Sequence, residues 1–133
     1  MGYNLLIIDD SAVTRKVLRR MIAMTGFDLS EVFEAPDGIE ALTILHEQRI
    51  DLIFVDINMP RMSGTELVAK LAEDNLLDAI PVIVITSDRN QPRLAELKRR
   101  GVRAYINKPF RPEELRDVMA QVFTNPTRDA HGS

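Results

Sequence analysis

Residues 50–60 read IDLIFVDINMP, an almost wholly apolar run that stops at Asp56. Such a run, rich in β-branched and aromatic residues, predicts a buried strand. Pro60 has no backbone N–H to give to a sheet, so the strand must end before it. The strand therefore presents a single carboxylate, Asp56, at its C-terminal end. An isolated Asp in this position is most often a turn former. The residues that end the other strands therefore decide whether Asp56 is a turn former or a functional carboxylate.

Four other short apolar segments also stop at polar or turn-forming residues. They predict strands at residues 4–8, 32–35, 82–85 and 104–107, which are followed in turn by Asp9 and Asp10, by the turn Pro36-Asp37-Gly38, by Thr86, and by Lys108. Very apolar strands of this kind are typical of sheets that are covered on both faces.

Between the strands, apolar residues recur at helical spacing. The five predicted helices carry Val13, Val17, Leu18, Met21 and Ile22; Ile39, Leu42 and Leu45; Leu67, Val68 and Leu71 after Gly64-Thr65; Leu94 and Leu97, closed by Gly101; and, after Pro112, Leu115, Val118, Met119, Val122 and Phe123. Ser11 is the expected N-cap of the first helix, and Gly26 lies near its expected end. The same helix is expected to turn Arg15, Lys16, Arg19 and Arg20 toward solvent.

The alternation of strand and helix, repeated five times, predicts an α/β fold. Such a pattern forms a five-stranded parallel sheet with helices on both faces, joined by right-handed crossovers. We expect residues 1–123 to form one domain and the polar, aperiodic residues 124–133 to be a disordered tail.

Composition excludes several classes of function. The net charge of −3 and the pI near 5.4 argue against nucleic-acid binding by bulk electrostatics. The absence of cysteine excludes disulfide scaffolds, thiol catalysis and thiolate metal sites. No apolar run is long enough to span a membrane, and no secretory signal is present, so we expect a cytoplasmic protein without membrane contact.

The carboxyl ends of parallel strands meet at one edge of the sheet, where ligands bind in open α/β folds. Asp9, Asp10, Asp56, Thr86 and Lys108 would therefore converge. Three close carboxylates need a cation, and oxygen ligands favour Mg²⁺ or Mn²⁺ over zinc. A carboxylate can also attack phosphorus. The set predicts Asp56 as a phosphoryl acceptor, with Asp9 and Asp10 holding the metal while Lys108 and Thr86 contact the transferred group.

In these features the sequence resembles the receiver domains of response regulators, of the chemotaxis-regulator kind. The motifs that carry the resemblance are Asp9-Asp10, Asp56-x-x-Met59-Pro60-x-Met62-x-Gly64, Ala35-x-Asp37-Gly38-x-Glu40-Ala41-Leu42, Thr86, and Lys108-Pro109-Phe110. The resemblance covers about residues 4–123 and implies a flavodoxin-like sheet of strand order 2-1-3-4-5.

The resemblance also implies a role for each site residue. A histidine kinase or phosphotransfer protein would phosphorylate Asp56, with Mg²⁺ bound directly by Asp10 and Asp56, through water by Asp9, and by the backbone carbonyl of Asn58. Thr86 and Tyr105 would then change position and remodel the surface of the fourth helix, fifth strand and fifth helix for an unidentified protein target. Such a protein is not an enzyme beyond assisting its own phosphorylation and dephosphorylation.

The sequence departs from the family pattern at Ser87, where Ala or Gly is usual. Asn58 and Asp88 occupy the variable positions that tune hydrolysis of the phosphate in this family. An amide and a carboxylate there are suited to orienting a water, so we expect a phosphate lifetime of minutes or less.

Three alternatives remain open. A phosphatase of the haloacid-dehalogenase type needs a second Asp two residues after the nucleophile, where this chain has Asn58. A flavin or nucleotide carrier needs a phosphate-cradling loop where this chain has Asp9-Asp10. A receiver-like scaffold would signal without phosphorylation. The sequence leaves open whether the protein is a monomer or a phosphorylation-linked dimer.

Overall fold

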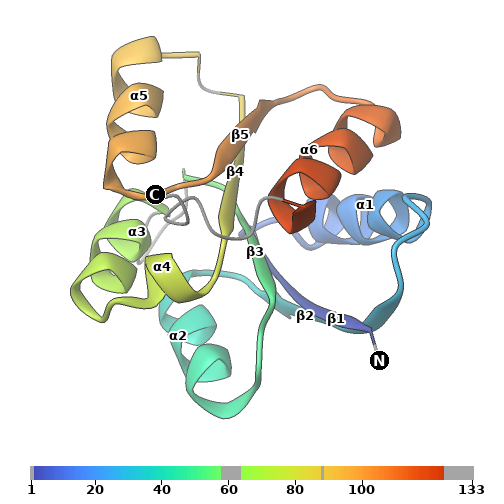
Figure 1. The fold of residues 1–133 in the computed structure, drawn as a ribbon, viewed down its shortest axis with the longest axis horizontal. Coiled ribbons are helices and arrows are strands. Elements are labelled where there is room, and N and C mark those ends of the chain that lie inside the picture. The colour runs from blue at the N-terminus through green and yellow to red at the C-terminus, as the bar shows by residue number, and fades with distance from the viewer. Residues whose placement is uncertain (1, 58–63, 88, 125–133) are drawn as a thin grey trace.

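The computed structural model describes residues 2–57, 64–87 and 89–124. Its centre is a five-stranded parallel sheet in the order β2-β1-β3-β4-β5 (Figure 1). The strands are β1 Tyr3–Ile8, β2 Leu29–Ala35, β3 Leu52–Val55, β4 Val82–Thr86 and β5 Ala104–Asn107. The predicted fold class and strand order are confirmed.

Helices cover both faces of the sheet (Figure 1). They are α1 Ala12–Ala23, α2 Gly38–Glu47, α3 Gly64–Glu73, α4 Leu76–Ala79, α5 Gln91–Arg100 and α6 Pro112–Thr124. One core cluster joins α1 and α6 to the sheet through residues such as Ile22 and Met119. The other joins α2, α3 and α5 to the opposite face through residues such as Leu67 and Leu94.

Alternation along the central strands explains their continuous apolar runs. In β3, Ile53 and Val55 face the cluster of α2, α3 and α5, whereas Leu52 and Phe54 face the cluster of α1 and α6. All four residues are at most 1% exposed. A strand that is covered on both faces needs apolar residues at every position, so the sheet is rigid where it carries the polar strand ends.

Short polar side chains begin the helices at the carboxyl edge of the sheet. The Ser11 hydroxyl accepts a hydrogen bond from the Thr14 backbone N–H at 3.1 Å, as predicted for an N-cap. The Asp37 carboxylate accepts one from the Glu40 N–H at 3.0 Å and caps α2. These caps fix the direction in which the chain leaves β1 and β2.

Several details differ from the sequence-based expectation. Strand β2 begins at Leu29 rather than at residue 32, because an edge strand pairs on one side only and tolerates the exposed Ser30 and Glu31. The four-residue helix α4 was not predicted, since so short an element shows no periodicity. Val13 and Val17, on the predicted apolar face of the first helix, are 73% and 52% exposed.

Among the described residues, no helix combines the length and the apolar character that a bilayer crossing requires.

Candidate functional site

Three acidic residues meet where β1 and β3 end. The pairing of Ile8 with Val55 brings the following residues, Asp9 and Asp56, to the same level of the sheet. The ladder continues through this point, because the Asp56 N–H donates to the Ile8 carbonyl at 3.0 Å. Both carboxylates therefore start from the rigid centre of the sheet rather than from a free loop.

Carboxylate oxygens of Asp9, Asp10 and Asp56 lie within 4.8 Å of one another. Asp9 is buried, Asp56 is half-buried and Asp10 is exposed. Two like charges at this separation repel by roughly 3–4 kcal/mol at an effective dielectric constant of about 20. Such a group is stable when a cation neutralises it, and an oxygen-only donor set suits Mg²⁺ or Mn²⁺. The described residues therefore fit the hard divalent cation that was predicted.

Lys108 supplies a positive charge at the same place. Its Nζ lies 3.5 Å from Asp9 Oδ2 and 3.8 Å from Asp56 Oδ2. The residue directly follows β5, and its backbone N–H donates to the Thr86 carbonyl at 2.8 Å, which continues the β4–β5 ladder. An ammonium that contacts two carboxylates offsets part of their repulsion and faces any anion that arrives at Asp56.

Asp9 is held on several sides. Its backbone N–H donates to the Ala35 carbonyl at 3.1 Å, and its Oδ1 accepts from the Ser11 N–H at 2.9 Å. Its backbone carbonyl accepts from Arg15 Nη1 at 2.6 Å. The turn from β1 into α1 is consequently fixed by contacts to β2 and to the first two turns of the helix.

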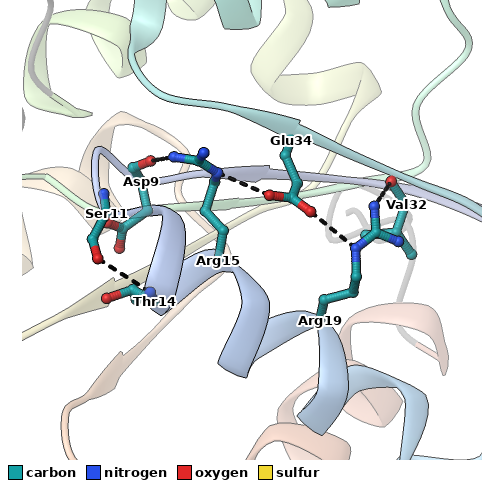
Figure 2. A network of polar contacts seen from close by, with 7 residues as sticks. All are labelled: Asp9, Ser11, Thr14, Arg15, Arg19, Val32 and Glu34. Carbon is teal, nitrogen blue, oxygen red and sulfur yellow. Dashed lines mark hydrogen bonds and ion pairs between the residues drawn. The ribbon is translucent and has the colours of Figure 1, made fainter.

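A polar network links α1 to β2 beside this turn (Figure 2). Arg15 Nε and Arg19 Nε donate to the two carboxylate oxygens of Glu34, each at 2.9 Å. Arg19 Nη2 also donates to the Val32 carbonyl at 2.6 Å. Burial raises the pKa of the Glu34 carboxyl, but hydrogen bonds from Arg19 and Arg15 and their charges outweigh it, so its pKa lies below the ordinary 4.5.

Arg15 was expected to point toward solvent from the polar face of α1, and the structure corrects this expectation. Its side chain is only 15% exposed because it folds back against β2 and the Asp9 carbonyl. Helical periodicity reports which face of a helix is apolar, and it does not report where a long arginine side chain can reach. The pairing of β1 with β2, which brings Glu34 near α1, is the information that the sequence lacked.

Gly64 packs directly against the backbone that carries Asp56. Its N–H donates to the Ile57 carbonyl at 3.0 Å. A Cβ atom at this position would lie 2.4 Å from Ile57 Cα and 2.5 Å from the Asp56 carbonyl oxygen. The start of α3 thus sits closer to the strand end than any side chain would permit.

An apolar cavity of about 390 Å³ opens beside the charged groups. It lies between α1 and the β5–α6 connection, and its lining includes Val13, Val17 and Phe110. Asp9, Asp56 and Lys108 form its polar end. The exposed valines of α1 therefore line a cavity that reaches the acidic site.

Residues 5–120 match the response regulator receiver domain family. The chain belongs to this family. As a receiver domain it is 31% identical over 120 residues to the chemotaxis protein CheY of Pseudomonas aeruginosa, covering 90% of this chain and 95% of the relative. It is 34% identical over 121 residues to CheY1 of Helicobacter pylori strain J99, covering 90% and 96%.

Solved receiver structures show the same fold. Vibrio cholerae CheY4 superposes with a TM-score of 0.81 at 30% identity, covering 92% of this chain and 99% of that one. The receiver domain of a Francisella response regulator superposes with a TM-score of 0.82 at 25% identity, covering 95% and 100%. The agreement extends over nearly the whole receiver domain.

Two further predicted site residues, Thr86 and Tyr105, lie on the neighbouring strands β4 and β5. Thr86 ends β4 and is wholly buried, and the exposed Ser87 follows it. Tyr105 in β5 is half-buried; its hydroxyl donates to Gln91 Oε1 at 3.4 Å, and Lys98 Nζ lies 6.0 Å from the centre of its ring. Asn58 and Asp88 lie outside the described residues, so their predicted roles stay predictions.

Proposed function

We propose that this receiver domain accepts a phosphoryl group on Asp56. The observation that carries the proposal is the clustering of three carboxylate groups within 4.8 Å, with the Lys108 ammonium within 4 Å of two of them. Family membership supports the same reading. Because the relatives are named chemotaxis proteins, we further propose a two-component pathway of chemotaxis type, with a histidine kinase or phosphotransfer protein as donor.

The transfer is a displacement at phosphorus. A carboxylate oxygen of Asp56 forms a bond to phosphorus while the bond to the donor's nitrogen or oxygen breaks, and that electron pair leaves with the donor group. A Mg²⁺ ion held by Asp9, Asp10, Asp56 and the Asn58 carbonyl would neutralise charge on the phosphoryl oxygens. Lys108, which contacts Asp56, would pair with the same oxygens. The bond from the Asp56 N–H to the Ile8 carbonyl holds the nucleophile in the sheet and so helps to orient it.

The signal is a change of packing that the phosphoryl group favours. Thr86 is buried at rest, so we propose that its hydroxyl moves to bond the phosphoryl group and that Tyr105 changes rotamer in response. The surface of α5, β5 and α6 then presents a different face to a protein target. Ser87, Asn58 and Asp88 set a phosphate lifetime of minutes or less, and the protein turns over no other substrate.

Intact-mass measurement tests the proposal. The protein is incubated with Mg²⁺ and acetyl phosphate, and Asp56→Asn is the control. We expect one phosphate adduct on the original chain and none on the variant. An adduct that survives the substitution would refute Asp56 as the acceptor. Many turnovers on ordinary phosphate esters would instead indicate a phosphatase.

A further inference from the structure

Arg15 contacts two different elements with one guanidinium group. Its Nη1 donates to the backbone carbonyl of Asp9 at 2.6 Å, and its Nε donates to Glu34 Oε1 at 2.9 Å (Figure 2). The side chain is 15% exposed, so these contacts are partly shielded from water. A planar fork with fixed donors holds two acceptors in a defined relative position, which a single ammonium does not do.

The carbonyl that Arg15 holds belongs to the peptide unit that joins Asp9 to Asp10. A peptide unit is planar, so an anchored carbonyl also fixes the orientation of the N–H and Cα at its other end. Asp9 is additionally held through its own N–H and carboxylate. Asp10 is exposed and lies after these anchors. The Ser11 N–H bond to Asp9 Oδ1 closes the turn across Asp10, and the Arg15 contact holds the Asp9–Asp10 peptide unit itself.

Glu34 keeps the guanidinium in place. Its second oxygen accepts from Arg19 Nε at 2.9 Å, so the carboxylate is itself held between two arginines of α1 (Figure 2). Because Glu34 lies on β2, it ties the orientation of Arg15 to the sheet rather than to the helix alone. Groups outside the metal site that hold a ligand in its binding orientation commonly contribute to the affinity for the metal.

We propose that Arg15 is a positioning residue of the acidic site, which fixes the Asp9–Asp10 peptide and thereby raises the affinity of the three carboxylates for a divalent cation. The inference rests on the proposed function, because it assigns Arg15 to the cation site of that same reaction. Arg15 touches neither the cation nor the phosphoryl group and acts through the backbone of Asp9.

The sign of the effect separates positioning from simple charge. Arg15 is a cation next to a cation site, so its charge alone weakens Mg²⁺ binding, and its removal would tighten binding. If Arg15 acts by positioning, its loss weakens binding despite the removed repulsion. Arg15→Lys keeps the charge but loses the two-point contact, so it shows the positioning effect without the compensating electrostatic gain.

Calorimetric titration with MgCl₂ provides the test. Calorimetry is chosen because the chain has no tryptophan whose fluorescence could report binding. We expect Arg15→Lys to bind Mg²⁺ roughly tenfold more weakly than the original chain, and Arg15→Met to bind more weakly by a smaller factor. Lys16→Met, which removes one charge from the exposed neighbouring residue, is the matched control and changes affinity less than about twofold. Unchanged affinity in Arg15→Lys, or tighter binding in Arg15→Met, would overturn the proposal.

A second readout excludes a merely structural effect. The Mg²⁺ concentration that half-saturates phosphorylation should rise in Arg15→Lys by the same factor as the dissociation constant, while the rate at saturating Mg²⁺ stays near that of the original chain. A lower saturating rate with an unchanged half-saturation point contradicts the proposal. Should Arg15→Lys fail to fold, Arg15→Met carries the test against Lys16→Met, because removal of a positive charge alone would tighten Mg²⁺ binding.

The proposed function and the positioning role of Arg15 can be refuted separately. If the original chain neither binds Mg²⁺ nor acquires phosphate, the proposed function itself is wrong. If the original chain does both and Arg15→Lys matches it in affinity, only the role of Arg15 is wrong.

Discussion

Gly64 lies against the backbone of the acidic site with no room for a side chain. Its position against Ile57 and the Asp56 carbonyl leaves no space for a Cβ atom, although it is not itself a ligand or a nucleophile. The strand end and the start of α3 are thus packed backbone to backbone. Any side chain here must move the segment that carries Asp56.

We therefore predict that Gly64→Ala slows phosphorylation by roughly ten- to hundredfold, because a nucleophile displaced by about 1 Å no longer meets the phosphorus in line. The overpacking should also lower the free energy of unfolding by about 1–3 kcal/mol. The rate of adduct formation with acetyl phosphate and a urea titration measure the two effects.

Gly26→Ala is the matched control for this variant. Gly26 has a φ of 87°, so alanine is strained there, but a Cβ atom would meet nothing within 4 Å. We expect Gly26→Ala to lose about 1 kcal/mol of stability while its phosphorylation rate is unchanged. Equal phosphorylation rates in the two variants would show that Gly64 does not position Asp56.

At the residue scale the sequence predicted the acidic site better than its surroundings. Asp9, Asp56 and Lys108 each directly follow an apolar strand, and Asp10 is the next residue after Asp9. Their proximity could be predicted because parallel strands end at a common edge. Arg15 could not be found in this way, because its partner Glu34 lies on another element. A contact between elements is visible only once the sheet order and register are known.

At the scale of the elements, the Glu34 network joins α1 to β2 through two ion pairs and so affects stability as well as the site. The Glu34 pKa is lowered in the folded protein, so the ionised form favours folding. This contribution is complete above the unfolded-state pKa near 4.5 and is lost as the pH falls through the lower folded-state value.

We predict that Glu34→Gln lowers the free energy of unfolding by about 1 kcal/mol at neutral pH, a modest value because the pairs are partly exposed. The difference from the original chain should shrink toward zero in acid. Urea titrations of both chains from neutral to acid pH measure this difference in the free energy of unfolding. A difference that stays constant with pH would mean that the lost contact is not the ionised carboxylate.

A second contact between elements lies among the side chains of Tyr3, Phe27 and Phe123. The rings of Tyr3 and Phe123 are stacked with centroids 3.9 Å apart, and Phe27 meets both edge-on. The three residues come from the start of β1, the connection after α1 and the end of α6. These ring contacts pack the end of α6 against the start of β1, near the domain boundary predicted at residue 123.

Phe123→Ala should lower the free energy of unfolding by about 2 kcal/mol, below the usual cost of a core phenylalanine because the ring is only half-buried. Tyr3 is six residues from Asp9 along β1, so this cluster sits at the opposite end of the strand from the acidic site. Under conditions where Phe123→Ala and the original chain are both folded, their phosphorylation rates should therefore agree within about twofold. A strongly reduced rate would indicate coupling between the two ends of the sheet.

At the scale of the whole molecule, cation binding should appear as folding stability. A ligand that binds the folded state alone adds about 2.7 kcal/mol at one hundred times its dissociation constant. We expect Mg²⁺ to raise the urea midpoint, and EDTA to reverse the shift. Asp10→Asn should lose most of the response, yet be more stable than the original chain in EDTA, because one of three repelling carboxylates is gone.

The opposite pattern, with Asp10→Asn less stable in EDTA and equally responsive to Mg²⁺, would mean that Asp10 supports the fold rather than the cation.

Most of the fold followed from the sequence because periodicity and strand-end residues are local signals, and the strand order came from the family resemblance. The start of β2 and helix α4 escaped prediction because an edge strand and a four-residue helix leave weak patterns. The exposure of Val13 and Val17 escaped it because a spacing shows that residues share a face without showing whether anything covers that face.

In the proposed reaction, Asp56 itself becomes an acyl phosphate. Borohydride reduces an acyl phosphate to an alcohol and would convert a phosphorylated aspartate to homoserine, which peptide mass spectrometry locates in the chain. After treatment with acetyl phosphate and Mg²⁺, we expect homoserine at position 56 and intact aspartate at positions 9 and 10. Homoserine at position 9 or 10, or at no position in a sample that carries the phosphate mass, would contradict it.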